Sequence, residues 1–359
     1  MSDHVFSNFK LGNMLLKNRI VMAPMTRCRC INNLPNESVA KYYAQRAEAG
    51  LIITEGISPS DNGLGYARIP GLYTSEHSHA WKTVTDAIHH AGSRVFAQLM
   101  HCGRAAHPDN LPSGMEILAP SPIAITDGTM WTDQNGMQPY PVPEEMTEHD
   151  IECTIEEYAH SADLAMQAGF DGVELHGANG YLIDQFLNLA SNHRTDKWGG
   201  PIENRLRFAI EVTKAVAKKI GPDKVGFRMS PYGVFNGMMA DTHIEDVFER
   251  LAADLQKIGI LYVHIVDHSS MGAPEVKPSV KKKIRDNFKG VVILSGGYDV
   301  KKADHDLAER KGDLFAFGRA FISNPHLVSK LKHKKTLVPA DHETFYTPGE
   351  KGYIDYPLD

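Results

Sequence analysis

The sequence predicts a single (β/α)8 barrel, in which eight parallel strands alternate with helices and close into a ring. Seven short β-rich runs each follow a glycine at the end of an amphipathic stretch, and one further apolar run precedes them all. A length of 359 residues suits one such barrel. An open doubly wound sheet is the alternative, and it is disfavoured because no Gly-x-Gly-x-x-Gly turn opens a helix. We therefore expect one barrel domain over residues 1–359.

The glycine junctions give the order of the elements. Glycine just past a helix adopts a left-handed backbone that other residues resist, and a strand can begin after it. The run that precedes the junctions is 20–23, and the junctions themselves are 49–54, 92–98, 169–175, 221–228, 259–266, 290–294 and 312–317.

The stretches before the glycines have the apolar spacing of helices. Thr147 with Asp150 resembles a capping box that opens the helix running to Gly169. One face ahead of Gly259 carries Val247, Leu251, Leu255 and Ile258.

Two segments do not fit the repeat. Residues 9–16 predict a β-hairpin around Gly12-Asn13, which could plug the bottom of the barrel. Residues 102–147 contain seven of the chain's 20 prolines, so they cannot form a regular helix. Because this Pro-rich excursion follows the third strand, we expect it to lie over the top of the barrel as a lid or wall.

Composition excludes several classes of protein. With 38 basic and 44 acidic residues the net charge is −6, which argues against nucleic-acid binding. No apolar run is long enough to span a membrane, and the first residues lack the features of a signal peptide, so a cytoplasmic protein is expected. The cysteines do not have zinc-site spacing, and we expect unpaired thiols at Cys28, Cys30, Cys102 and Cys153.

The active site of such a barrel lies at the carboxyl ends of its strands. The last two strands are followed by Gly296-Gly297 and by Gly318-Arg319. Glycines leave backbone N–H groups open to an anion, and an arginine can close the site with a fork of donors. These two loops together predict a phosphate site.

A second cluster follows the fourth strand, where His176, Asn179 and Tyr181 lie within six residues. His and Asn at this spacing could both donate a hydrogen bond to one oxygen atom. The phenol of Tyr181 is a plausible proton donor for the same pocket. Three polar residues at one strand end favour a functional role over simple packing.

A metal-dependent barrel hydrolase is the competing function. The chain has 18 histidines, and Asp267-His268 follows the sixth strand. A catalytic metal needs three well-placed protein ligands, and no such set can be assembled from the strand ends. We therefore expect no metal, and keep the hydrolase as the alternative.

Several motifs occur in the order found in one known family. They are residues 16–27, 176–182, 192–196 with 199–200, 228–233, 317–325, 344–346 and 352–357. Because of these motifs, the chain resembles the Old Yellow Enzyme family. Members of this family are FMN-dependent NAD(P)H ene-reductases, also called alkene reductases. The resemblance runs nearly end to end.

The resemblance implies a non-covalent FMN across the barrel top. Gln98 and Arg228 would hold the pyrimidine end of the flavin, and Gly56 would leave room for the ring. The phosphate would lie against Gly296, Gly297, Gly318 and Arg319, in agreement with the loops described above. Residues at the first strand would line the isoalloxazine, namely Pro24, Met25 and Thr26.

The resemblance also implies a mechanism with two hydride transfers. NADPH or NADH reduces the flavin and leaves, and an alkene conjugated to a carbonyl or nitro group takes its place. His176 and Asn179 would bind the substrate oxygen, hydride would go to the β-carbon, and Tyr181 would protonate the α-carbon. Phenolic ligands would bind at the same site as the alkene. The protein is expected to be a monomer or a homodimer. The substrate cavity would be shaped by Tyr66, Phe345 and Tyr346.

Overall fold

Eight parallel strands close into a barrel at the centre of the molecule. The computed structural model describes residues 4–240 and 242–358. Each strand pairs with the next along the chain, and the last pairs with the first, with Phe315 opposite Ile20. The predicted barrel is confirmed. Its strands are β3 (Ile20–Met22), β4 (Leu51–Ile57), β5 (Arg94–Leu99), β10 (Gly172–Gly177), β11 (Val225–Met229), β12 (Tyr262–Val266), β13 (Val291–Ser295) and β14 (Leu314–Phe317).

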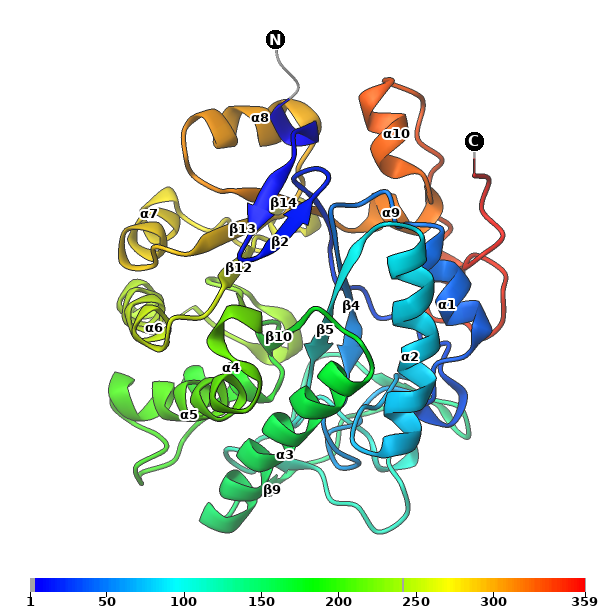
Figure 1. Cartoon of the computed structure of the whole chain (residues 1–359). Coiled ribbons are helices and arrows are strands. Elements are labelled where there is room, and N and C mark those ends of the chain that lie inside the picture. The colour runs from blue at the N-terminus through cyan, green and yellow to red at the C-terminus, as the bar shows by residue number, and fades with distance from the viewer. Residues whose placement is uncertain (1–3, 241, 359) are drawn as a thin grey trace.

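Helices form a ring around these strands (Figure 1). The longer ones are α1 (Glu37–Ala44), α2 (Ser75–His90), α3 (Glu148–Gln167), α5 (Ile202–Ile220), α6 (Ile244–Ile258), α7 (Pro278–Asn287) and α8 (Val300–Ala308). The shorter ones are α4 (Leu182–Leu187), α9 (Arg319–Ser323) and α10 (Leu327–Lys332). Short 3₁₀ turns are η1 (His4–Phe6), η2 (Ile31–Asn33), η3 (Pro108–Asn110), η4 (Pro222–Lys224), η5 (Phe235–Gly237), η6 (Ser269–Met271) and η7 (His342–Thr344).

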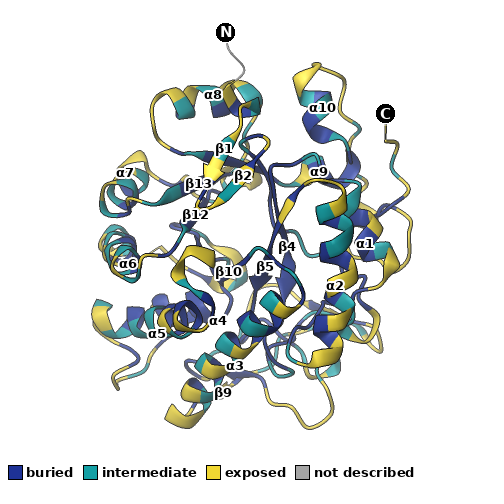
Figure 2. Ribbon diagram, viewed as in Figure 1, coloured by how far each residue is buried: buried dark blue, intermediate teal, exposed yellow. Residues whose placement is uncertain are grey.

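The helices begin and pack as their sequences predict. The capping box of α3 is present, because the Thr147 hydroxyl accepts from the backbone N–H of Asp150 and the Asp150 carboxylate accepts from that of Thr147. In α6 the predicted face is turned inward: Val247, Leu251 and Leu255 are buried, and Ile258 is partly buried against the core. Figure 2 shows the result, with buried strands inside and exposed outer faces on the helices.

The junction glycines divide into two kinds. Gly259 has the expected left-handed conformation (φ 80°, ψ 31°), and positive φ values also occur at Gly92, Gly169 and Gly221. The expectation is wrong for the other three junctions. At Gly50 the reason for glycine is a close approach, because a Cβ atom there would lie 2.1 Å from the Asn18 carbonyl oxygen. The others without a positive φ are Gly290 and Gly312.

The predicted hairpin closes one end of the barrel. Strands β1 (Phe9–Leu11) and β2 (Met14–Leu16) pair antiparallel. Leu11 and Leu16 are at most 1% exposed, and they belong to one apolar cluster with side chains of the barrel interior. The other buried members of this cluster are Val21, Ala23, Leu51, Ile53, Phe96, Tyr262, Ile293, Leu314 and Ala316.

The Pro-rich segment contains no α-helix, as predicted, and instead forms short strands. They are β6 (Leu118–Ala119), β7 (Met130–Thr132), β8 (Gly136–Gln138) and β9 (Glu144–Glu145). Strands β7 and β8 form an antiparallel hairpin, and β6 pairs with β9.

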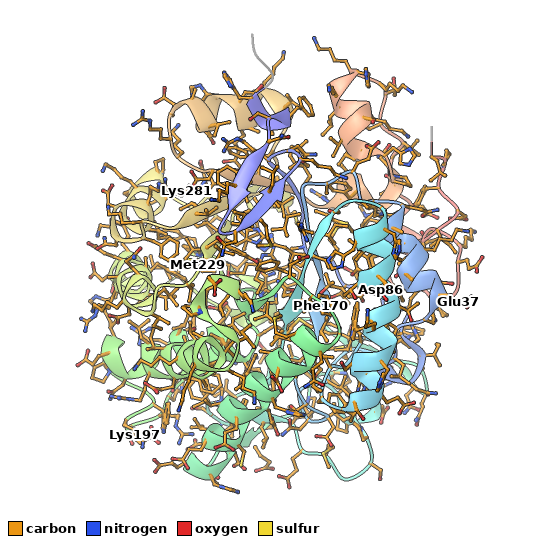
Figure 3. The ribbon with its side chains drawn as sticks, viewed as in Figure 1. Glu37, Asp86, Phe170, Lys197, Met229 and Lys281 are labelled. Carbon is orange, nitrogen blue, oxygen red and sulfur yellow. The ribbon has the colours of Figure 1, made fainter. Side chains whose placement is uncertain are left out.

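Charged side chains lie mostly at the outside of the barrel. In Figure 3, Glu37 and Lys197 lie at the periphery, whereas Met229 of β11 lies in the buried interior. Over the described ranges, no helix combines the length and the apolar character needed to cross a membrane.

Candidate active site

A cavity of about 1000 Å³ opens at the carboxyl ends of the barrel strands. Its walls come from the loops after most of the strands, from the hairpin β7–β8 and from the chain near Phe345. With one exception, every site residue predicted from the sequence lines it. These residues are Pro24, Met25, Thr26, Tyr66, Gln98, His176, Asn179, Tyr181, Arg228, Gly296, Gly297, Gly318, Arg319, Phe345 and Tyr346.

The exception is Gly56. It is absent from the lining, and a Cβ atom there would lie 2.4 Å from the sulfur of Met100. Met100 itself lines the cavity. The missing side chain of Gly56 leaves room for Met100, and the expected role of Gly56 toward the flavin ring stays a prediction.

His176 lies one residue before the end of β10, with its imidazole buried at the cavity. Its Nδ1 atom has no hydrogen-bond partner among the described residues. Burial, followed by the positive charge of Arg228, holds the pKa of His176 well below its ordinary value. The ring is therefore neutral at physiological pH, with one N–H to donate and one nitrogen to accept.

Tyr181 lies beside this imidazole, with its ring centroid 4.9 Å from that of His176. Its hydroxyl is 3.1 Å from the hydroxyl of Tyr66. Burial raises the pKa of both phenols, so both are protonated at neutral pH. Two protonated phenols, those of Tyr66 and Tyr181, therefore lie close to the neutral imidazole of His176.

Asn179 occupies a left-handed backbone conformation with φ of 60°, which Asn tolerates better than most residues. Its backbone N–H donates to the Ser230 hydroxyl over 2.9 Å. Its side-chain Oδ1 is 2.7 Å from Nε2 of His268, a residue of the loop after β12. Neighbouring loops thus fix Asn179 at both backbone and side chain.

A buried carboxylate lies below the cavity, inside the barrel. Glu174 of β10 accepts from Gln98 Nε2 (2.8 Å) and from the Tyr262 hydroxyl (3.1 Å), and it lies 2.9 Å from His264 Nδ1. Burial raises its pKa, but His264, Arg228 and Gln98 outweigh this effect and keep the pKa below its ordinary value. Gln98 thus donates to Glu174 inside the barrel and also lines the cavity.

Arg228 of β11 stands next to this network. Its Nε is buried and has no partner among the described residues. Burial lowers its pKa, and Glu174 opposes that shift. A buried guanidinium with a free donor is costly unless a ligand completes its hydrogen bonds.

The glycine loops lie across the cavity from β10. Gly296 and Gly297 both have positive φ values, of 120° and 62°. A Cβ atom at Gly296 would lie 2.1 Å from the carbonyl oxygen of Asp267, so only glycine fits. Arg319 is exposed at the rim, at the start of α9. The backbone here is open to a ligand, as a phosphate site requires.

Buried arginines hold the chain near Phe345 in place. Arg27 donates to the carbonyl oxygens of Phe345 (3.1 Å) and Gly352 (2.8 Å). Arg29 donates to those of Phe345 (2.7 Å) and Thr344 (2.7 Å). Charge-assisted hydrogen bonds of this kind are the stronger ones, so the Phe345 wall is firmly positioned.

These features fit FMN. The side chains of Arg228, whose Nε has no partner among the described residues, and of Gln98 suit the polar edge of a flavin, and the loops at Gly296 and Gly297 suit its phosphate. The cavity volume of about 1000 Å³ leaves room for a substrate or co-substrate molecule beside FMN.

Comparison with known proteins decides the family. Residues 4–337 match the NADH:flavin oxidoreductase / NADH oxidase family. A chanoclavine-I aldehyde reductase of Penicillium roqueforti is 40% identical over 365 residues, covering 98% of this chain and 95% of the relative. The solved structure of morphinone reductase superposes with a TM-score of 0.95 at 37% identity, over 99% of this chain and 96% of that one. The Old Yellow Enzyme homologue of Zymomonas mobilis gives 0.94 at 38%, over 99% of both chains.

The chain belongs to the Old Yellow Enzyme family. Its identification from the sequence motifs is confirmed, as is its expected activity: it is an FMN-dependent oxidoreductase with NAD(P)H ene-reductase activity. One solved structure of morphinone reductase contains tetrahydroNAD. This finding supports a nicotinamide co-substrate for the present protein.

The metal-hydrolase alternative finds no support. Over residues 4–240 and 242–358, no three His, Cys, Asp or Glu side chains gather where they could bind a metal ion. Asp267 instead bonds Lys281 over 2.8 Å, and His268 contacts Asn179.

Sequence reasoning missed several residues that line the cavity of this Old Yellow Enzyme. From the sequence His268 is expected only as a metal ligand, although its place after the sixth strand is a signal for a cavity residue. Phe235 and Asn236 lie in η5, and Trp131 and Met137 lie in the hairpin β7–β8, where no motif marked them.

Proposed function

We propose that individual residues of the cavity have separate roles in the ene-reductase reaction. His176 and Asn179 bind the oxygen of an alkene conjugated to a carbonyl or nitro group, and Tyr181 protonates its α-carbon. Gln98, Arg228 and the loops at Gly296, Gly297, Gly318 and Arg319 hold FMN. The observation that carries this proposal is that neutral His176, Asn179 and protonated Tyr181 line one cavity, with the ring centroids of His176 and Tyr181 4.9 Å apart.

Bound FMN supplies the hydride chemistry: it takes hydride from NAD(P)H and gives it to the β-carbon of the alkene. Pro24, Met25 and Thr26 would line its ring. Arg228 would place a fixed positive charge at its edge, where negative charge develops when the ring accepts electrons.

The oxygen-binding pair polarises the substrate. Hydrogen bonds to the carbonyl or nitro oxygen draw electron density away from the β-carbon, and they strengthen as negative charge builds on the oxygen. A neutral imidazole and a primary amide both offer N–H donors for this purpose. Because burial keeps His176 neutral, its donor is present without a charge that would have to be desolvated.

Tyr181 completes the reaction by moving a proton. Its buried phenol stays protonated at neutral pH, so the proton at its hydroxyl is available for the α-carbon. Tyr66, 3.1 Å away, can then donate a hydrogen bond to the phenolate that forms. The substrate is enclosed by Phe345 and Tyr346, both of which line the cavity.

The test separates the two half-reactions. Replacing Tyr181 by Phe should leave flavin reduction by NADPH nearly intact and slow enone reduction by roughly 10²- to 10⁴-fold, because the general acid is lost. Anaerobic stopped-flow absorbance of the flavin measures both rates. Tyr140→Phe is the matched control, because Tyr140 lines the cavity without contacting Tyr181 through any hydrogen bond found in the described chain. Equal slowing of both half-reactions in Tyr181→Phe would show that the role assigned to Tyr181 is wrong.

A further inference from the structure

The amide side chain of Asn179 is held from outside its own loop. The contact comes from His268, which follows β12 and lines the same cavity. Nε2 of His268 lies 2.7 Å from Oδ1 of Asn179. An amide oxygen can only accept a hydrogen bond, so this contact uses the imidazole tautomer that carries its proton on Nε2.

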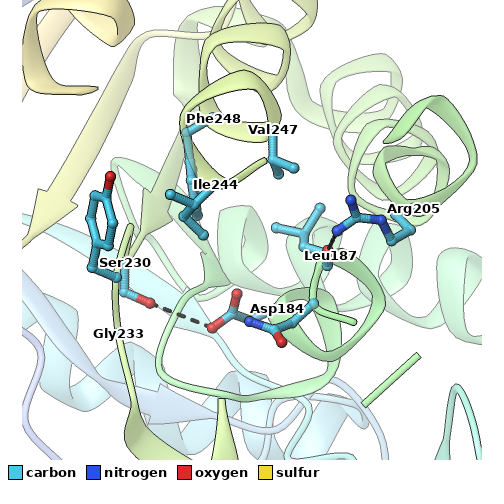
Figure 4. A pocket seen from close by; sticks show the side chains of 10 residues that line it. Asp184, Leu187, Arg205, Ser230, Gly233, Ile244, Val247 and Phe248 are labelled. Carbon is cyan, nitrogen blue, oxygen red and sulfur yellow. Dashed lines mark hydrogen bonds between the residues drawn. The ribbon is translucent and has the colours of Figure 1, made fainter. Parts of the chain in front are cut away.

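The backbone of Asn179 is held as well. Its N–H donates to the Ser230 hydroxyl, and its carbonyl oxygen accepts from Asn236 Nδ2 over 2.9 Å. Ser230 donates in turn to Asp184, and Figure 4 shows the serine hydroxyl turned toward that carboxylate. Asp184 also accepts from the backbone N–H of Gly180 over 2.9 Å, so the loop is fixed at two successive residues.

These contacts use nearly all of the polar atoms of Asn179. The backbone N–H, the backbone oxygen and the side-chain oxygen each have a partner. Only Nδ2 has none among the residues that the structure describes. An amide nitrogen can only donate, so Asn179 meets a ligand in the cavity as a donor.

The surroundings of His268 hold its imidazole in contact with the Asn179 amide. Its ring packs against Phe235 of η5, with centroids 5.9 Å apart. Asp267, the preceding residue, accepts from the backbone N–H of Ser269 and bonds Lys281, which anchors the loop. Burial, and then Arg228, lower the pKa of His268 to about 4, so its imidazole is neutral at physiological pH and carries a single ring proton, which the contact with Oδ1 of Asn179 places on Nε2.

We infer that His268 is a positioning residue that fixes the orientation of the Asn179 amide, so that the site selects ligands that present an acceptor oxygen. The inference rests on the proposed function, because it assumes that Asn179 binds the substrate oxygen. Without His268 the amide could rotate and turn its oxygen toward the ligand, which would repel a carbonyl, nitro or phenolate oxygen.

A double-mutant cycle on the FMN-loaded enzyme tests this inference. The probe is 4-cyanophenol, whose oxyanion resembles the substrate oxygen, and its Kd is read from the change in flavin absorbance. His268→Leu should weaken binding by roughly 3- to 10-fold, the loss expected for one hydrogen bond. His268→Gln, whose amide nitrogen can also donate to Asn179, should stay within about 2-fold of the parent protein. In the Asn179→Ala background, His268→Leu should have no further effect.

Three outcomes would overturn the inference: equal loss in the Leu and Gln variants, the same loss in the Asn179→Ala background, or no loss in His268→Leu. The FMN content and melting temperature of each variant report on folding. If Asn179→Ala alone leaves the Kd of 4-cyanophenol unchanged, the proposed oxygen-binding pair fails. If Asn179→Ala weakens binding but shows no coupling to His268, only the present inference fails.

Discussion

The two ends of the barrel differ in what fills them. At the closed end the hairpin β1–β2 covers an apolar cluster that includes Leu11, Leu16 and Phe96. At the open end the cavity lining mixes apolar side chains with polar ones, and two of the polar residues, His176 and Arg228, have buried atoms without partners in the described chain. The same strands run through both ends, so the difference comes from the residues at each strand terminus.

This difference shows where stability and function reside. Apolar packing at the closed end stabilises the fold and needs only the right volume and shape. An unpartnered buried polar atom at the open end costs about 1–3 kcal/mol, a cost that a bound ligand can remove. The ends are joined by Glu174, whose carboxylate bonds Tyr262 of the apolar cluster and Gln98 of the cavity.

The largest effect is expected at the closed end. Leu11→Ala should lower the free energy of unfolding by about 2–5 kcal/mol, because it leaves a void under the barrel. The kinetics of enone reduction by the folded enzyme should not change. Chemical denaturation and steady-state assays measure the two quantities.

The control for this prediction lies in the same hairpin. Leu15 is 65% exposed, so Leu15→Ala should change the stability by no more than about 0.5 kcal/mol. A large change in kcat for Leu11→Ala would show that the two ends are not independent.

An intermediate effect is expected in the glycine loops at the open end. Gly297→Ala places a Cβ atom at a positive φ and 3.0 Å from Ser270 Cβ, so it should cost about 1–2 kcal/mol of stability. It should also weaken FMN binding roughly 10-fold, which corresponds to about 1.4 kcal/mol, because the backbone loses its open approach. Fluorescence of released FMN gives the affinity.

Gly200→Ala is the matched control, since Gly200 has φ of 79° and nothing within 4 Å of the added Cβ. It should show the same backbone strain with unchanged FMN affinity. Equal loss of FMN from both variants would contradict a phosphate role for Gly297.

The smallest effect is expected from pH. The pKa of His176 is held well below its ordinary value of about 6.5, so the imidazole is neutral above that pH and protonates only in more acidic solution. The affinity for a neutral ketone such as cyclohexanone should therefore be nearly constant between about pH 6 and pH 8. Titrations of the flavin absorbance at several pH values measure this, and a midpoint near the ordinary histidine pKa would show that His176 is not buried as described.

Much of the fold and the site could be predicted because local sequence carried the signal. Strand and helix order followed from the glycine junctions, and the capping box at Thr147 needed only neighbouring residues. The phosphate loops and the cluster at His176 were visible because barrel strand ends converge. The site roles themselves rest on a resemblance in sequence motifs.

The sequence by itself determined the barrel, its hairpin plug and the polar clusters at the strand ends, because hydrophobic spacing and turn residues act over a few positions. Tertiary structure alone decided that Met100 takes the space at Gly56, and that His268 meets Asn179 across 89 residues of chain. It also decided which polar atoms remain unpartnered. Such contacts join separate βα loops, and no local pattern fixes the distance between side chains that far apart in the sequence.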